Sequence, residues 1–184
     1  MAQFTEEPII SDRFTNAVLL AFHWHQKQVR KNNTPYVSHL MQVSGLVLEH
    51  NGTEDEAIAA ILHDAIEDLN VNSEDIRERY GEEVVRIVQA LSEDPRLTNP
   101  EKKAAYVDRM ARADYSVALV SCADKLHNLR CYRNQPELFD EKVEMFYSLL
   151  IPIYNDKLKG THAYPMVKEM DHLYYLIEDD DWNN

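Results

Sequence analysis

Apolar residues recur three or four positions apart along nearly the whole chain, with polar residues between them. That spacing lines the apolar side chains along one face of an α-helix, whereas a half-buried strand would show strict alternation. Capping residues before these segments, and Gly, Asn or Pro after them, mark where each helix begins and ends. The pattern predicts an all-α fold, with helices over about 11–31, 36–50, 53–69, 73–80, 82–91, from 99 onward, 115–133, 136–160 and 163–177.

Several of these boundaries carry specific signals. Thr53 is followed three residues later by Glu56, a pair that can form a capping box at a helix N-terminus. Gly52 is typical of the end of the preceding helix, and Pro100 of a first helical position. The acidic segment 178–184, after the last helix, is expected to fray.

The composition agrees with a single helical domain. The chain has 184 residues, enough to bury a substantial core, and only four glycines, with no alternating run rich in Val or Ile. No internal repeat or low-complexity linker divides it. We therefore expect one domain over residues 1–184, in which the C-terminal helices of 136–177 complete a bundle.

Charge and cysteine content narrow the choice of partners. A net charge of −13 argues against a broad surface for nucleic acid or an anionic membrane, since both attract basic proteins. No uncharged run is long enough to span a bilayer, and the N-terminus lacks the basic and apolar regions of a signal peptide. The two cysteines, Cys122 and Cys131, are too few for a secreted disulfide framework. These features favour a cytoplasmic protein that acts on a small molecule, alone or as an oligomer.

Ionisable residues inside apolar segments point to a bound metal. His63 and Asp64 directly follow the apolar run 59–62, so the sequence predicts a buried helix that carries charge. Burying a charge without a partner is costly, and a divalent cation would compensate it. His39 and Asp124 occur in suitable segments elsewhere, and together the four offer the mixed nitrogen and oxygen ligands that Mn, Fe, Zn or Ni accept. Hydrolysis with water activated by the metal is the expected chemistry.

Two further acids follow this pair by one helical turn. Glu67 is four residues after His63, and Asp68 is four residues after Asp64, so a continuous helix would place both on the metal side. A carboxylate there can orient or deprotonate an attacking water, or protonate a leaving oxygen. Alternatively, the two acids are solvated residues at the end of a helix.

Small clusters of cations accompany these acids in an otherwise acidic chain. Arg30 and Lys31 precede the first candidate ligand and could contact a base or a phosphate group, or form the solvated end of the first helix. Lys125, Asn128 and Arg130 follow the last candidate ligand at spacings that allow a shared helix face. All five are candidate substrate contacts.

The order and surroundings of these residues resemble a known family. A histidine, a His-Asp pair and a distant aspartate in this order are similar to the ligands of the HD phosphohydrolase superfamily. The flanking sequence over residues 14–133 resembles, more specifically, the hydrolase domain of RelA/SpoT enzymes and the stand-alone small alarmone hydrolases. The matching segments are HQKQVRK (25–31), PYVSH (35–39), LHDAIED (62–68) and ADKLHNLR (123–130). The chain departs from the family pattern at Ser92-Glu93-Asp94, where a Thr-Lys-Leu segment is usual.

The resemblance implies a compact all-α HD-domain bundle with a Mn²⁺ ion held by four ligands, namely His39, His63, Asp64 and Asp124. It implies hydrolysis of the 3′-pyrophosphate of ppGpp or pppGpp to GDP or GTP, with Glu67 and Asp68 positioning and activating water. Arg30 would contact the guanine base, Lys31 would lie in the nucleotide pocket, and Asn128 would hold the ribose or its neighbouring phosphate.

Two other functions stay open at this point. One is an HD phosphohydrolase for a different nucleotide, such as a 5′-nucleotidase-like enzyme or one that acts on an adenine alarmone. The other is a non-catalytic regulatory module that binds a nucleotide without turnover. Such a module would have no need of Glu67 and Asp68, which speaks against it.

Overall fold

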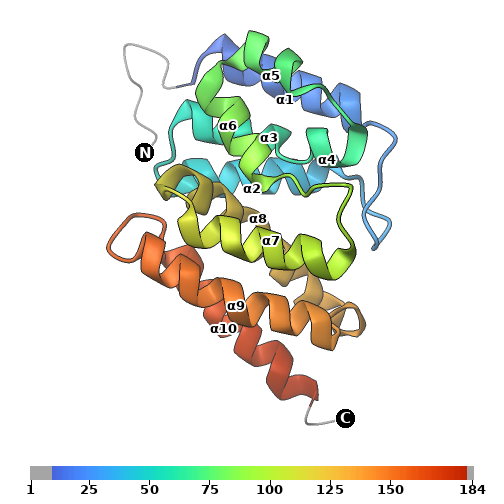
Figure 1. The fold of residues 1–184 in the computed structure, drawn as a ribbon, viewed down its shortest axis with the longest axis vertical. Helices are drawn as coiled ribbons and strands as arrows, with labels where there is room; N and C mark the ends of the chain where they lie inside the picture. The colour runs from blue at the N-terminus through green and yellow to red at the C-terminus, as the bar shows by residue number, and fades with distance from the viewer. Residues whose placement is uncertain (1–9, 182–184) are drawn as a thin grey trace, which may run out of the picture.

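The structure is a computed structural model that describes residues 10–181, without the side chains of 179–181. Within that range every regular element is helical, and an isolated pairing of Val29 with Pro35 is the only β-type contact. The all-α prediction is therefore confirmed. Figure 1 labels the helices, which are α1 (Asp12–His25), α2 (Val37–Glu49), α3 (Glu54–Leu62), α4 (Ala65–Leu69), α5 (Ser73–Tyr80), α6 (Glu82–Leu91), α7 (Asn99–Arg112), α8 (Tyr115–Asn134), α9 (Glu141–Leu158) and α10 (Tyr164–Asp181), with a 3₁₀ turn, η1 (Pro136–Leu138), before α9.

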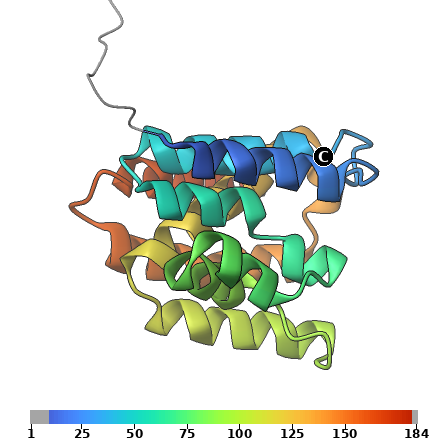
Figure 2. The ribbon, with the colours of Figure 1, turned by 90° about the horizontal axis from the view of Figure 1, so that it is seen from above.

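In Figure 1, α1 to α6 form the upper half of the bundle, α7 and α8 cross its middle, and α9 and α10 lie at its lower end. α2 and α3 lie side by side, and both contact α8. α1 and α6 pack against α3, whereas α9 and α10 pack against α8, so that α8 joins the two halves of the molecule (Figures 1 and 2).

α3 and α8 are buried on nearly all sides where they meet. Every residue over 56–62 is buried, and so is every residue over 117–124. The apolar residues of both stretches belong to one cluster, whose members range along the chain from Ala17 to Ile177. The apolar surface that this cluster removes from water is the main favourable contribution to the stability of the bundle.

The predicted helix starts are present. Thr53 and Glu56 form a capping box, in which the N–H of Thr53 donates to the carboxylate at 2.6 Å and the N–H of Glu56 donates to the hydroxyl at 3.3 Å. Pro100 lies in the first turn of α7. At Gly52, just before the capping box, an added Cβ would collide with Val47, so the close approach of the chain requires glycine there.

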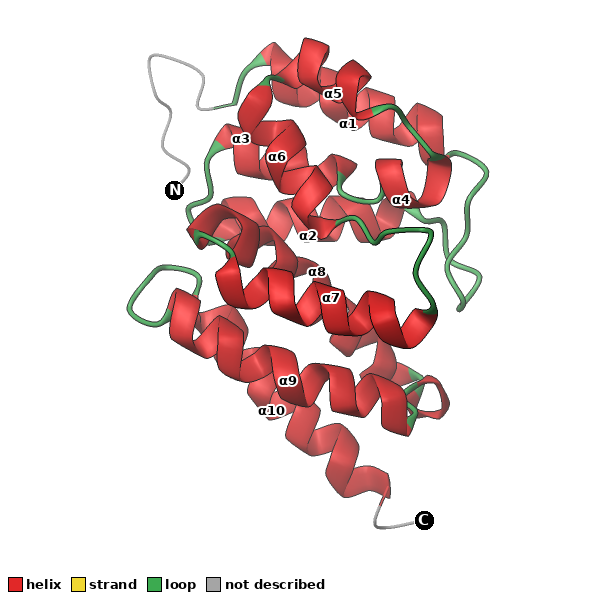
Figure 3. Cartoon of the chain, viewed as in Figure 1, coloured by secondary structure: helices red, strands yellow, loops and turns green. Residues whose placement is uncertain are grey.

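The first helix ends earlier than predicted. α1 stops at His25, and residues 26–36 form a loop that is closed by backbone hydrogen bonds (Figure 3). Asn33 adopts a positive φ of 61°, a conformation that asparagine tolerates and that lets the chain reverse. The predicted boundary near residue 31 is wrong because these turn contacts compete with the helix, and Arg30 and Lys31 therefore lie on a loop.

The predicted helix over 53–69 is broken in the middle. α3 ends at Leu62, His63 and Asp64 form a turn, and α4 begins at Ala65. The prediction of one continuous helix is wrong. A break of one turn inside a buried segment leaves the spacing of apolar residues unchanged, so this spacing cannot reveal it.

One boundary in the C-terminal third also differs. Pro136 begins a 3₁₀ turn and not the long helix that was predicted from it. The long helix α9 starts at Glu141, because the carboxylate of Asp140 accepts the N–H groups of Lys142 and Val143 and so caps it.

The acidic tail lies only partly within the described residues. Residues up to 181 continue α10, and the remainder of the tail that was expected to fray falls outside the described range. Among the described residues, no helix combines the length and the apolar character needed to cross a membrane.

Candidate metal centre and its cavity

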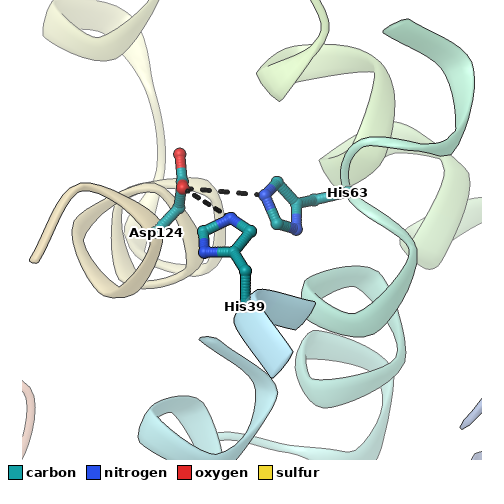
Figure 4. A group of neighbouring side chains, drawn as sticks. All are labelled: His39, His63 and Asp124. Atoms are coloured by element: carbon teal, nitrogen blue, oxygen red, sulfur yellow. Dashed lines mark ion pairs between the residues drawn. The ribbon is translucent and has the colours of Figure 1, made fainter. Parts of the chain in front are cut away.

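Three buried side chains from three helices meet near the centre of the bundle. His39 comes from α2, His63 from the end of α3 and Asp124 from α8 (Figure 4). Nε2 of His39 lies 3.2 Å from Oδ1 of Asp124, and Nε2 of His63 lies 3.7 Å from the same oxygen. One ligand atom from each residue lies within 4.8 Å of the others, close enough for all three to share one ion. The structure thus brings together three residues that the sequence predicted as ligands.

Asp64, the fourth predicted ligand, adjoins this group. Its Oδ2 atom lies 3.0 Å from Nε2 of His63 and 3.7 Å from Nε2 of His39. In a continuous helix, consecutive side chains would point about 100° apart. The turn between α3 and α4 instead allows two consecutive residues to face one centre.

Hydrogen bonds decide which ring nitrogen of each histidine faces the centre. Nδ1 of His63 donates to the carbonyl of Ala60 at 2.8 Å, so Nε2 carries a lone pair, and this buried atom has no hydrogen-bond partner among the described residues. Nδ1 of His39 lies 2.7 Å from Nδ1 of His127, so one of the two donates. With the proton on His39, both Nε2 atoms present lone pairs to the centre. Metal-binding histidines typically hold their other ring nitrogen in such a bond, so the arrangement fits a cation.

The electrostatics of the group also suit a divalent cation. Burial opposes ionisation of Asp124, but the charge of Lys125 and the two neighbouring histidines hold its pKa well below the usual value. Burial likewise opposes protonation of His63, yet the charge of Asp64 raises the pKa of this histidine above its usual value. The negative charges that favour protonation of these ligands also favour the binding of a metal ion. When the ion binds, it displaces the proton from the ligand.

Tyr36 belongs to the site, although it was not among the residues predicted from the sequence. Its hydroxyl donates to Oδ2 of Asp64 at 2.6 Å, and its ring stacks on the buried ring of His25 with centroids 5.3 Å apart. Burial raises the pKa of Tyr36, so its hydroxyl keeps its proton and remains a donor. The one signal in the sequence was the position of Tyr36 within the motif PYVSH.

The two predicted catalytic acids occupy different places. Glu67 lines the cavity beside the metal ligands, and its carboxylate accepts the backbone N–H of Glu93 at 2.9 Å. Burial raises the pKa of Glu67. Asp68 is not among the lining residues, and it accepts a hydrogen bond at 2.6 Å from the side-chain amide of Gln28. The amide oxygen of Gln28 is bonded in turn to Nδ1 of His25, also at 2.6 Å.

A cavity of about 240 Å³ opens beside the metal ligands. Four of the five predicted substrate contacts line it, namely Arg30, Lys31, Lys125 and Asn128. A guanidinium N–H of Arg30 donates to the side-chain oxygen of Asn128 at 2.7 Å, which connects the α1–α2 loop to α8 across the cavity wall.

The remaining contacts on α8 serve other purposes in this structure. Nζ of Lys125 lies 2.6 Å from Oδ2 of Asp124, so this lysine supports a candidate metal ligand. Arg130 is turned away from the cavity and pairs with Glu169 of α10 at 2.6 Å. The structure therefore does not bring Arg130 together with the other predicted contacts.

Part of the cavity wall comes from residues that no motif had marked. Lys103 and Tyr106 project from α7, and Cys131 and Tyr132 from the C-terminal part of α8. In the sequence, Lys103 is an ordinary polar position of an amphipathic helix, so only the packing of α7 beside α9 and the cavity reveals it.

The chain that carries this site is similar to known proteins. The family model for the HD domain matches residues 17–150. MESH1 from Drosophila melanogaster, named guanosine-3′,5′-bis(diphosphate) 3′-pyrophosphohydrolase, is 31% identical over 83% of this chain and 88% of its own length. The protein of the same name from Homo sapiens is 30% identical over 82% and 86%. A GTP pyrophosphokinase from Brucella melitensis is 30% identical over 67% of this chain, which corresponds to 18% of that longer protein.

Solved structures agree with these relatives. A metazoan ortholog of SpoT, described as hydrolysing ppGpp and acting in starvation responses, has a TM-score of 0.77 and 26% identity, over 95% of this chain and 98% of its own. A Listeria monocytogenes protein with 24% identity shares the fold, with a TM-score of 0.72. Because the family model spans most of the chain and the MESH1 relatives match it over most of both lengths, this protein belongs to the HD domain family, in the MESH1 and RelA/SpoT branch that its motifs resemble.

Proposed function

We propose that this protein hydrolyses the 3′-pyrophosphate of ppGpp or pppGpp in a metal-dependent reaction that yields pyrophosphate and GDP or GTP. The observation that carries the proposal is the buried group of His39, His63 and Asp124, which lies in the wall of a cavity lined by cations. The MESH1 relatives, which are named for the hydrolysis of this 3′-pyrophosphate, support the same reaction.

The charges around the cavity suit a polyphosphate. Four cations line it, which are Arg30, Lys31, Lys103 and Lys125. Four acids balance them, which are Asp64, Glu67, Glu93 and Asp124. The cavity is thus locally neutral in a chain whose net charge is −13, and a divalent ion would make it positive. A positive cavity concentrates an anionic substrate that the rest of the surface repels.

Mn²⁺ is the ion we propose for this centre. Two imidazole nitrogens and two carboxylates form a mixed donor set, which suits Mn better than Ca or Mg. When bound, the ion would supply Lewis-acid polarisation of a phosphoryl oxygen and lower the pKa of water. The chain prepares the ligand Asp124 for this role, because Lys125 and Asn128 bind its two oxygens at 2.6 and 2.7 Å.

We assign the proton transfer to Glu67. Its carboxylate lines the cavity, and burial raises its pKa, which makes it a stronger base than a solvated glutamate. Asp68 does not line the cavity, so we assign it an indirect role: through its bond to Gln28 it holds the end of α4 in place next to Glu67. Arg30 offers a planar surface and N–H donors to the guanine base, and Lys31 offers a charge to a phosphate group.

Product analysis tests this function directly. Incubation with Mn²⁺ and ppGpp should release GDP and intact pyrophosphate in one step, as seen by anion-exchange chromatography. His63→Ala should release neither, because it deletes a ligand. A parallel panel of guanine and adenine nucleotides covers the other functions. Release of single phosphates, or hydrolysis of a 5′-monophosphate with no reaction of ppGpp, would contradict the proposal.

We place this reaction in the cytoplasm. Both cysteines are free, Cys122 in the core and Cys131 at a partly exposed position. Free thiols are typical of proteins that work in a reducing compartment.

A further inference from the structure

Glu93 and Lys103 form an ion pair in the cavity wall, outside the group of metal ligands. Nζ of Lys103, on α7, lies 2.9 Å from Oε1 of Glu93, in the segment between α6 and α7. Both residues line the cavity. The reaction described above assigns a role to neither side chain.

The lysine of this pair can change partners without being buried. The side chain of Lys103 is 51% exposed, so water can solvate its ammonium when the pair separates. The side chain of Glu93 is only 13% exposed, so part of the attraction is unscreened and has to be offset by the ligand. The ammonium also lies 4.6 Å from the ring centroid of Phe146. This cation–π contact therefore keeps the lysine at the cavity wall when its ion pair with Glu93 is broken.

The other cations that line the cavity hold different positions. Lys125 is bound to Asp124, and Arg30 is bonded to Asn128. Lys31 lies with Arg30 on the α1–α2 loop. Lys103 is thus the cation that α7 contributes, next to the segment that carries Glu93, and a phosphate on that side of the cavity would meet it.

We propose that Lys103 binds the β-phosphate of the nucleotide's 5′-diphosphate, a group that is not cleaved, and that Glu93 holds this lysine until the ligand displaces it. The inference rests on the proposed function, because it assigns a subsite within the same cavity. A phosphate group carries more negative charge and more acceptor oxygens than a carboxylate, so it outcompetes Glu93 for the ammonium. The backbone N–H of Glu93 can meanwhile keep its bond to Glu67, since only the two side chains have to move.

The exchange makes affinity depend on the number of phosphates. A ligand that reaches Lys103 gains a charge-assisted hydrogen bond but must first break the existing ion pair. A nucleotide too short to reach Lys103 leaves the ion pair intact and gains no affinity from this lysine. Glu93 therefore lowers affinity for every ligand that uses Lys103 and leaves the others unaffected.

Binding of GMP and GDP to the Mn²⁺-loaded protein, measured by isothermal titration calorimetry, tests this subsite. The unaltered protein should bind GDP more tightly than GMP. Lys103→Met should weaken GDP binding about tenfold, the scale of one charge-assisted hydrogen bond, and leave GMP binding unchanged. Glu93→Gln should strengthen GDP binding, because it releases the lysine.

Asp94→Asn is the matched control. It removes the same charge from the next residue, but Asp94 pairs with the exposed Arg96 at 2.7 Å and does not line the cavity. GDP affinity should therefore stay the same. Weaker GDP binding by Glu93→Gln, or equal gains from both acid-to-amide variants, would overturn the inference. Since binding needs no turnover, these results stand apart from a failure to hydrolyse ppGpp, which would contradict the proposed function alone.

Discussion

The cavity has a floor and a rim that are held together in different ways. The floor consists of the candidate ligands, and His39, His63 and Asp124 are only 2, 3 and 5% exposed. Each is fixed by a hydrogen bond or ion pair from inside the bundle. The rim consists of the α1–α2 loop, the segment 92–98 and α7, where the contacts are ion pairs and hydrogen bonds near solvent.

This contrast separates two tasks. A metal ion needs its ligands at fixed distances, so the floor must be rigid before the ion arrives. A nucleotide is large and charged, and a rim of partly screened ion pairs can exchange partners with it. Substitutions in the floor should therefore abolish function, whereas substitutions in the rim should have smaller effects, on affinity or on the placement of a neighbouring side chain.

The largest expected effect comes from the floor. His63→Ala and Asp64→Ala should remove both the bound ion and the activity, because each deletes a ligand from a buried centre. Metal content per chain can be measured by inductively coupled plasma mass spectrometry. His172→Ala, at an exposed position of α10, should retain the ion. Full metal content in the two ligand variants would show that the floor is not a metal centre.

Glu67 lies where floor and rim meet, and its loss should affect chemistry alone. Glu67→Gln should keep the metal but lower kcat on the order of 10²-fold or more, the usual scale for a general acid–base group. The glutamine can still accept the N–H of Glu93, so the loop stays in place. Normal turnover by this variant would show that Glu67 has no catalytic role and is only a polar residue of the cavity wall.

The raised pKa of Glu67 adds a dependence on pH. Since the base must be ionised, kcat/KM should fall as the pH drops through a pKa above that of a free glutamate, and the Gln variant should lack this limb. Ionising a group whose pKa is raised by folding destabilises the folded state as the pH rises through that pKa. Glu67→Gln should therefore have a higher Tm than the unaltered protein at neutral pH.

A smaller effect is expected on the rim, at Gln28. Gln28→Met removes the hydrogen bonds to Asp68 and to His25, and it should lower kcat about tenfold through misplacement of Asp68, with metal content unchanged. Gln26→Met is the matched control, because Gln26 bonds to the backbone of His23 at the surface. In the Asp68→Asn background, Gln28→Met should have no further effect. A tenfold loss in that background would mean that Gln28 acts independently of Asp68.

The smallest effect on activity is expected outside both regions. Thr53→Ala removes the capping box of α3 and should lower the free energy of unfolding by roughly 1 kcal/mol. Metal content and kcat should be unchanged, because the cap lies at the other end of the helix from His63. Urea denaturation measures the first effect and steady-state kinetics the second. Loss of metal from Thr53→Ala would mean that metal binding by the floor depends on the stability of the whole of α3.

More of the floor than of the rim could be predicted from the sequence, for a physical reason. Acids and histidines inside apolar segments are expensive to bury, so His63, Asp64 and Asp124 stood out without any knowledge of tertiary contacts. Helix starts such as Thr53 and Pro100 were predictable because capping depends on residues a few positions apart.

The rest is set by contacts between distant segments. Turns stabilise both the break after Leu62 and the loop that follows His25, and the spacing of apolar residues gives no sign of these turns. Lys103 has no local feature to distinguish it from other lysines on helix surfaces, and its role depends on Glu93, ten residues away. Arg130 shares the spacing of its neighbours but is drawn to α10 by Glu169.

The cavity also contains a chemical reporter of its own. Cys131 lies in its wall and is partly exposed, whereas Cys122, the other cysteine of the chain, is buried and has its pKa raised by that burial. A thiol reagent should therefore label the native protein at one position, because the thiolate is the reactive form. An environment-sensitive fluorophore attached to Cys131 would follow ligand occupancy in real time, without any engineered residue.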